Sequence, residues 1–458
     1  MKLTRREALA GAAAAALAGA GIYELADRLG GDAPKRKSVG RMGAADQHAL
    51  ELGVVEREGV EVVVPPLHHR LVTARIAAGD PRTAQRELED ALVALEQRFD
   101  PTSPAGLGVT VAWGLPYFDR VVPHQAAVHV PIDRRASAER RKRVLLDAVR
   151  FPSDPGETIL EQNDVAVLLR SDVPAHVNDG AKALFQDLRV FEVTSIRNGF
   201  VGGGLPKRMA AAAGIRGAEL IPDGAQLFLG FTSTQKDALG PRGIANFETL
   251  GYAELGPRAY FRGGTNMHVS HLFEDIEAWY LNFDFQERVD TAFKPGMRVK
   301  EDAQTVPQGR HQVASGGEVK RDFRDTGRIG HSAAIQTSSR LQRDVVGHDG
   351  TLYRRGTAIP QRADFDTLDN PFAWSSEPAR DSLQAAPAAG VHFVVFNPTS
   401  DDFHRNRLAM DGVLPDGTRL PLPARARGQG FNSVLRTTHR QNFLVPPRAH
   451  RSFPLAEL

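Results

Sequence analysis

Histidine is the side chain in this sequence that offers metal and proton chemistry most directly, because the chain contains no cysteine. Without cysteine there are no disulfides, thiol nucleophiles, cysteine zinc sites or iron–sulfur clusters. Metal chemistry therefore has to use histidine, carboxylate or a bound cofactor. His268 and His271 stand three apart in a predicted strand and should face opposite sides of it, so we do not expect them to bind one metal together. His68, His69 and His311 are weaker candidates still.

Other familiar catalytic patterns are missing from the sequence. It has no Gly-x-Ser-x-Gly elbow, no Walker loop and no His-Glu-x-x-His motif. The glycines at 202–204 lack the spacing and the later acidic partner of a dinucleotide fingerprint. With 57 basic and 55 acidic residues the formal net charge is +2. This near balance gives no broad attraction to nucleic acid.

The N-terminus has the pattern of an export signal. Arg5 and Arg6 precede an apolar run over 8–23 that is rich in alanine and glycine and too short to span a bilayer comfortably. A charged start, a short apolar region and small residues are typical of a signal peptide, and the paired arginines indicate the twin-arginine type. The alternative is an ordinary amphipathic first helix. We expect 1–30 to be the signal, the protein to be periplasmic or extracellular, and membrane contact to be limited to the twin-arginine translocase.

The elements that would position a site alternate between strands and helices from about residue 59. Residues 31–58 are expected to be a linker. The strand and helix patterns then follow the order β-α-β and β-α-β, which is that of a ferredoxin-like unit. Strands are predicted over 60–64, 70–77, 107–113, 164–169 and 189–196, and helices over 83–99 and 175–188.

The second half of the chain repeats this theme. Strands are predicted over 226–230, 265–272, 391–396 and 441–445. The polar, glycine-rich stretch 295–330 is expected to be a surface excursion or a loop that covers a cofactor. The predicted fold class is α+β, with two ferredoxin-like units in one chain. The first unit is expected over 59–215 and the second over 216–458.

Short motifs in a shared order make the chain resemble the dye-decolourising peroxidase family from about residue 60 to 450. The motifs are VTVAWG at 109–114, PYFDR at 116–120, NGFVGGGLP at 198–206, the segment 263–279, GHSA at 330–333, DGTLYRRG at 349–356, the segment 391–397 and FLVPP at 443–447. The resemblance implies two units arranged like a dimeric α/β-barrel, with haem b held by the second. It also implies hydrogen peroxide as oxidant and an organic or metal reductant.

The resemblance assigns roles to individual residues. His331 matches the axial ligand of the haem iron, which binds through one nitrogen of a neutral imidazole. Arg354 matches the distal arginine, whose guanidinium can stabilise negative charge on a departing peroxide oxygen. Arg355 is the alternative register, and a strand-end salt bridge is the alternative role. Haem propionates need cationic partners. The arginines available for them are Arg340, Arg343 and Arg405.

Two departures from the family pattern bear on turnover. The family's Gly-x-x-Asp-Gly motif is GFVGG at 199–203 here, so Gly202 stands where an aspartate base is expected. Gly202 and Gly203 would then form a tight turn that lets the backbone approach the haem face. The stretch 431–436 lacks the acid that would make the ligand histidine more basic. Whether Asp325, Glu274 or another acid replaces this base is left open.

Three functions therefore stay open. An exported haem peroxidase of the dye-decolourising type is favoured by the motif order along the chain. A haem carrier, sensor or iron-handling protein of the same fold, with little turnover, is favoured by the two missing acids. A cofactor-free member used for binding or structure is the third. The expected partners are hydrogen peroxide and a reducing substrate, nucleic acid is not expected, and a homo-oligomer is left open.

Overall fold

The first half of the chain forms a ferredoxin-like unit. The structure is a computed structural model and describes residues 22–23, 42–48, 53–77, 79–137, 141–241, 244–307, 315–371, 386–422 and 430–458. The strands of this unit pair in the order β8-β3-β7-β4, all antiparallel. Its elements along the chain are β3 (His68–Ile76), α3 (Pro81–Arg98), β4 (Gly108–Gly114), β7 (Val165–Ser171), α7 (Pro174–Lys182) and β8 (Phe191–Phe200).

Local sequence explains why α3 forms and how it packs. Asp80 caps the helix by accepting a hydrogen bond from the Thr83 amide at 2.9 Å, and proline stands at the first helical position, where its missing N–H costs nothing. Leu88, Leu92 and Leu95 recur at helical spacing and are buried against the sheet. The predicted helix over 83–99 is confirmed.

The second unit has the same arrangement with longer connections. Its strands pair in the order β14-β15-β10-β16, again antiparallel. The described part of the connection between β10 and β14 contains the helices α9 (Ile276–Leu281), α10 (Phe285–Ala292), α11 (Gly316–Thr326) and α12 (His331–Ser339). The remaining elements are β10 (Thr265–Glu274), β14 (Phe365–Thr367), β15 (Gly390–Asn397), α13 (Ser400–Met410) and β16 (Leu435–Val445).

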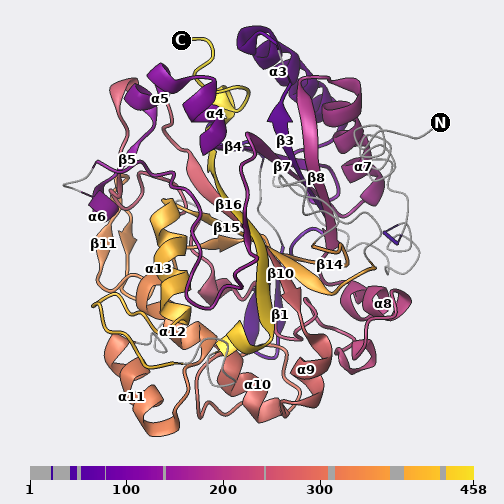
Figure 1. Cartoon of the computed structure of the whole chain (residues 1–458), viewed down its shortest axis with the longest axis vertical. Coiled ribbons are helices and arrows are strands. Elements are labelled where there is room, and N and C mark those ends of the chain that lie inside the picture. Colours follow the sequence, from indigo (N-terminus) through magenta and orange to yellow (C-terminus); the bar gives the residue numbers. More distant parts are fainter. Residues whose placement is uncertain are drawn as a thin grey trace.

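The two units close into one barrel. Phe200 of β8 pairs with Asp366 of β14 at one seam, and Trp113 of β4 pairs with Leu444 of β16 at the other. The pairing of β10 with β16 completes the ring. In Figure 1, α3 and α7 lie at the upper right, and α12 and α13 lie at the lower left. The predicted class, two ferredoxin-like units in an α/β-barrel-like arrangement, is confirmed.

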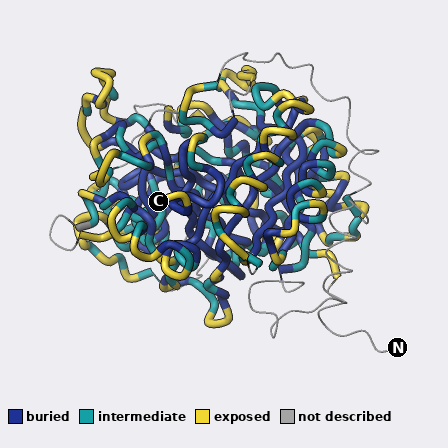
Figure 2. The backbone as a smooth tube through the Cα atoms, turned by 90° about the horizontal axis from the view of Figure 1, so that it is seen from above, coloured by how far each residue is buried: buried dark blue, intermediate teal, exposed yellow. Residues whose placement is uncertain are grey.

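A cluster of apolar side chains inside the barrel holds the short seams together. Each seam has very few paired residues, so most of the adhesion between the units comes from burial of apolar surface. Buried residues are concentrated in the middle of the molecule (Figure 2). The interior cluster draws on both units, for example with Leu71, Leu168, Met267, Phe365, Val394 and Phe443.

Two predicted segments differ from the structure. Residues 226–230 are a series of turns and not a strand. Their carbonyls accept from single donors outside any ladder, such as the indole of Trp279 to Leu229 and the hydroxyl of Tyr280 to Phe228. The stretch 295–330 contains α11, which a capping box of Ser315 and Glu318 starts. Val319 is the residue that α11 buries fully, so the apolar signal for a helix was weak.

The expected linker and signal are described only in part. Residues 54–57, inside the expected linker, form β1 (Val54–Arg57), which pairs with β2 (Val60–Val63). Most of the expected signal lies outside the described residues. Tyr23 is described, and its hydroxyl accepts a hydrogen bond from the Leu368 amide at 2.8 Å. Among the described residues, no helix has the length and apolar character needed to cross a membrane.

Candidate functional site

A cavity of about 210 Å³ lies in the second unit, between its strands and the helices α12 and α13. Alternate residues of a strand face one side of a sheet, and the cavity side takes the even residues of β10 and the odd residues of β15. These residues are Ser270, Leu272, Glu274, Val391, Phe393 and Val395. The wall is largely apolar, with a small set of charged groups, as in many ligand sites.

His331 is the first residue of α12 and lies on the wall of this cavity. Gly330 fixes the start of the helix, because a Cβ there would overlap the backbone of Phe293. The imidazole packs on Phe431 with ring centroids 4.7 Å apart. Its Nδ1 is buried and has no hydrogen-bond partner. Burial, with the charges of Arg362 and Arg407, lowers the pKa of His331 to about 3, so the ring is neutral at physiological pH and able to bind a metal.

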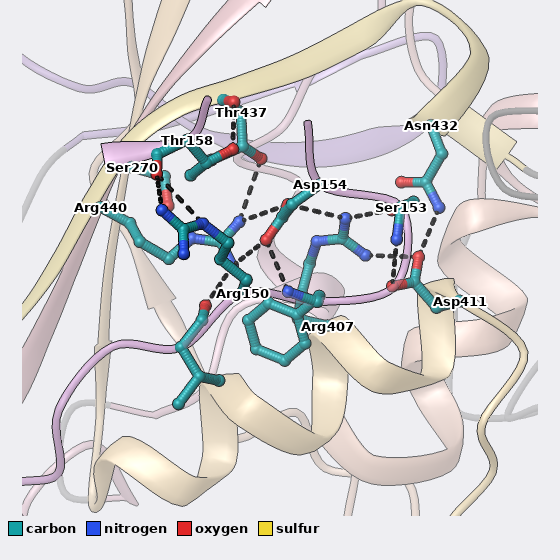
Figure 3. A network of polar contacts seen from close by, with 12 residues as sticks. Arg150, Ser153, Asp154, Thr158, Ser270, Arg407, Asp411, Asn432, Thr437 and Arg440 are labelled. Carbon is teal, nitrogen blue, oxygen red and sulfur yellow. Dashed lines mark hydrogen bonds and ion pairs between the residues drawn. The ribbon is translucent and has the colours of Figure 1, made fainter. Parts of the chain in front are cut away.

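Two of the arginines on the cavity wall are held by carboxylates. Arg407 of α13 forms ion pairs with Asp411 at 2.7 Å and Asp154 at 3.3 Å. Arg440 of β16 forms an ion pair with Asp154 at 2.8 Å. Figure 3 shows Asp154 between the two guanidinium groups. Asn432 donates to Asp411 at 2.9 Å. These four charges compensate one another and make a rigid floor for the cavity.

Two further arginines of the wall have a different setting. Arg340 is buried and donates to the carbonyl of Gly356 at 2.7 Å. Arg362 lies in the short strand β13 (Gln361–Arg362), and its buried Nε has no partner. Burial lowers the pKa of Arg362, while the charge of Asp364 opposes this shift. Among the described residues, Arg362 forms no ion pair, and the charge nearest in effect to its guanidinium is that of Asp364.

Three buried carboxyl groups stand close to this wall. Asp364 and Glu274 line the cavity, and Asp366 lies two residues farther along β14. Burial raises the pKa of Asp364 to about 6, with the charge of Arg362 acting against the shift. Burial also raises the pKa of Glu274 and of Asp366, and the repulsion between these two acids raises that of Asp366 further. A pKa near 6 suits a proton acceptor at neutral pH.

The structure brings only some of the predicted residues to the cavity. His331 and Arg340 line it, as do Phe431 and Asn432 from the stretch that lacks an acid. Glu274, one of the two acids left open as a base, lines it as well. Asp325 lies at the surface beside Arg324.

Arg354 does not reach this cavity. It follows the hairpin of β11 (Val345–Val346) and β12 (Leu352–Tyr353). Its side chain is 60% exposed and forms an ion pair with Asp344 at 2.8 Å. Arg355 also lies on this exposed hairpin, and its amide donates to Asp344. A guanidinium surrounded by water cannot act through the low dielectric that a buried site provides.

Gly202 and Gly203 form a turn after β8 and are not part of the cavity wall. Both have a positive φ, +63° and +61°, which glycine adopts without strain. The Gly202 amide donates to the carbonyl of Gln226 at 2.9 Å. The predicted tight turn exists and is joined to the residues just before Leu227, which does line the cavity.

The remaining predicted groups also have clear positions. His268 packs on Phe403 and bonds to Asn442, whereas His271 lies beside His392 with ring centroids 4.3 Å apart. Their opposite orientation is confirmed. The described part of the chain contains no cluster of three or more histidine or carboxylate side chains arranged to hold a metal ion. Arg405 pairs with Asp401 and Asp402 along α13. Arg343 is not on the cavity wall, and His311 lies outside the described residues.

Sequence analysis missed Arg362, Asp364, Arg407 and Arg440. A signal for the first two existed, because charged residues alternate at 362, 364 and 366 between apolar residues. Charged residues at every second position predict a strand with one charged face, and such a face is a candidate ligand-binding surface. No comparable local signal marks Arg407 or Arg440, which become neighbours only through Asp154.

The fold is that of solved dye-decolourising peroxidases. The chain is similar to a putative DyP-type peroxidase from Shewanella oneidensis, with a TM-score of 0.50, 14% identity, and coverage of 84% of this chain and 94% of that one. It is similar to the same degree to the encapsulated DyP-type peroxidase from Mycobacterium smegmatis, with a TM-score of 0.50, 13% identity, and coverage of 86% and 96%. At such identities the likeness concerns the fold.

The family itself is shown by sequence. A family model described as a family of unknown function, DUF7405, matches residues 66–447. The chain belongs to this family. No protein among the curated ones matches the chain.

Proposed function

We propose that this protein is a haem peroxidase of the dye-decolourising type, with haem b bound in the cavity beside His331. The observation that carries the proposal is the neutral imidazole of His331 on the wall of a largely apolar cavity, with Nδ1 buried and unpartnered. Haem iron bound there would supply the centre at which the O–O bond of hydrogen peroxide is broken. Arg340 would be a partner for a haem propionate.

The residues of the wall fit such a group. The apolar side chains from β10 and β15 would accept the faces of a flat macrocycle, and the neutral imidazole offers a nitrogen ligand over the whole physiological pH range. The site holds more cationic than acidic groups, which suits a ligand that brings carboxylates of its own.

Arg362 and Asp364 are the residues we assign to peroxide chemistry. The guanidinium of Arg362 would stabilise negative charge on the departing oxygen, and the Asp364 carboxylate would accept the peroxide proton and return it to that oxygen. The sequence pattern assigned the first role to Arg354. Its exposed ion pair with Asp344 favours Arg362, which lies on the cavity wall. Asp364 would supply the base that Gly202 cannot.

A haem titration tests the binding part of the proposal. The full chain is expected to develop a Soret band as haem is added, and His331→Ala is expected to lose it or to shift it to that of free haem. His348→Ala, an exposed histidine on the β11–β12 hairpin, is the matched control and should bind like the parent. A chain without any Soret band, or a His331→Ala variant with the parent spectrum, would contradict the proposal.

A haem binder with little peroxidase turnover is the second candidate. It is favoured by the lack of an acidic partner for the Nδ1 atom of His331, because such a partner normally makes the ligand more basic. Peroxide-dependent oxidation of a phenol or dye separates the two candidates. Turnover that depends on Arg362 supports the peroxidase, and haem binding without turnover supports the second candidate.

We also propose export through the twin-arginine translocase to the periplasm or the outside of the cell. The support is the Arg5-Arg6 pair before the apolar run. Replacing both arginines with lysine should keep the protein inside the cell, as fractionation would show. Export of that variant at the parent level would contradict this proposal.

A further inference from the structure

A second and larger cavity, of about 590 Å³, lies next to the first. Arg340, Ala358 and Arg362 border both cavities, so the two spaces share a wall. The far end of the second cavity reaches the first unit, where Thr110 of β4 and Arg170 of β7 line it together with His48. The proposed function uses none of these three residues.

Arg170 is a buried cation that the protein does not neutralise. Its residue is 3% exposed, and it forms no ion pair with a described residue. Its Nη2 donates to His48 Nε2 at 3.4 Å, and its buried Nε has no partner. Burial alone lowers the pKa of Arg170 to about 9, so the guanidinium stays charged at neutral pH. A buried charge of this kind is costly until a counter-charge arrives.

Three other buried arginines of the described chain each have a carboxylate partner, which Arg170 lacks. Arg197 is paired with Glu161, Arg407 with Asp411, and Arg440 with Asp154. Like Arg170, Arg362 has a buried Nε without a partner. Both arginines border the second cavity. Arg135, Arg405 and Arg440 also have a buried Nε without a hydrogen-bond partner, but each of them forms an ion pair with a carboxylate.

The other residues of the cavity wall indicate the chemical class of the ligand. Two acids border the cavity, Asp46 and Asp237, and neither forms an ion pair with Arg170. The charge of Asp237 acts on Arg340 instead. Lys236 also borders the cavity and is paired with Glu61. The wall has an apolar part as well. It includes Val63, Pro65, Leu239, Phe396 and Val445. A molecule that fits needs a carboxylate at one end and an apolar body.

We propose that this cavity binds a small organic carboxylate, with its carboxylate on Arg170 and its apolar body against apolar residues of the wall such as Leu239 and Phe396. A planar guanidinium favours a carboxylate because it can donate two parallel hydrogen bonds. Binding of this ligand does not depend on haem. A role for it as the reducing substrate, next to the cavity of His331, does rest on the proposed function.

Calorimetric titration of the full chain, purified without added haem, tests the inference. The probes are benzoate, its neutral isostere benzamide, and inorganic phosphate. Benzoate is expected to bind at least about tenfold more tightly than benzamide, since a charged hydrogen-bond acceptor is lost in the isostere. Equal binding of benzoate and benzamide, or no binding of benzoate, would overturn the proposal. If phosphate bound as tightly as benzoate, the proposal that the ligand has an apolar body would be wrong.

Substitution of Arg170 identifies the contact. Arg170→Gln is expected to weaken benzoate binding by at least about tenfold, with an unchanged or higher melting temperature in the absence of ligand, because an uncompensated charge has been removed. Arg98→Gln, an exposed arginine on α3, is the matched control and should bind like the parent. A lower melting temperature with unchanged benzoate binding would show a structural role and overturn the assignment. Because no peroxidase activity is measured, failure of this site and failure of the haem proposal are separate results.

Discussion

The two ferredoxin-like units share a topology but differ in what lies between their helices and their strands. In the first unit, α3 places Leu88, Leu92 and Leu95 on the sheet, and Leu184 and Phe185, in the helical turn after α7, join the same apolar core. In the second unit, α12 buries mainly small or polar residues, such as Ser332, Ala333 and Ser339, and α13 buries Arg407. Helices with short side chains cannot fill the space that the same topology provides, so a cavity remains.

This difference separates stability from function in the molecule. The filled unit contributes apolar burial, which stabilises the fold. The hollow unit gives up part of that burial and contains His331, Arg362 and Asp364 instead. Burying charged groups costs free energy. In the second unit, Arg362 and Asp364 line the cavity, where they can contact a ligand. Substitutions that add volume, remove volume or remove charge in each unit test this difference.

Filling the hollow side should have the largest effect. Ile335→Trp adds volume to the cavity wall and is expected to abolish the Soret band while the melting temperature of the haem-free protein changes little. Leu88→Trp on the filled side should overpack the core and destabilise the protein by about 1–3 kcal/mol or more. Thermal denaturation and haem titration measure both. Haem binding by Ile335→Trp at the parent affinity would place haem outside this cavity.

Removing the open guanidinium should be the next largest effect. Arg362→Leu is expected to lower peroxide-dependent turnover by about 100- to 1,000-fold, the usual result of losing one preorganised charge at a developing anion. Haem binding should persist, as a Soret titration would show. Arg354→Leu is the comparison variant and tests the sequence-based assignment directly. A larger loss in Arg354→Leu than in Arg362→Leu would return the role to Arg354.

Large-to-small substitutions should reduce the free energy of unfolding by different amounts in the two units. Leu88→Ala is expected to destabilise the protein by about 2–5 kcal/mol, because it creates a cavity in a packed core. Ile335→Ala should cost less, since its side chain already borders open space and the change enlarges an existing cavity. Denaturant unfolding measures both variants. Equal losses would mean that the hollow side is packed as tightly as the filled one.

The smallest predicted effect is the pH dependence of Asp364. The folded carboxyl keeps its proton up to about pH 6, whereas the unfolded one releases it near pH 3.9. Between these values the folded state binds more protons, so stability from this group falls as the pH rises from about 4 to about 6. Asp364→Asn should remove that part of the pH dependence, and Asp325→Asn, at the surface, should not. Turnover should rise over the same pH range as the Asp364 carboxyl ionises. If the pH profile of turnover were unchanged in Asp364→Asn, Asp364 would not be the base.

The sequence carried much of the fold because the relevant signals are local. The spacing of Leu88, Leu92 and Leu95 predicted α3, and the run 391–396 predicted β15, since helical and strand periodicities appear within a few residues. Residues 226–230 were predicted wrongly as a strand. Their apolar side chains are buried by packing, while their carbonyls are satisfied by distant indole and phenol groups that no local pattern reveals.

The candidate site divides in the same way. Two repeated units and the candidate ligand His331 could be predicted from the order of the motifs. The lack of thiol chemistry follows from the composition, since the chain has no cysteine. Only the tertiary structure decided that Arg362 reaches the cavity while Arg354 stays in water, and that Asp154 joins Arg407 to Arg440. It also decided that Arg170 borders a second cavity without an ion pair to any residue that the structure describes. The physical reason is that burial and charge pairing depend on which distant segments meet, and strand register and helix packing set that in three dimensions.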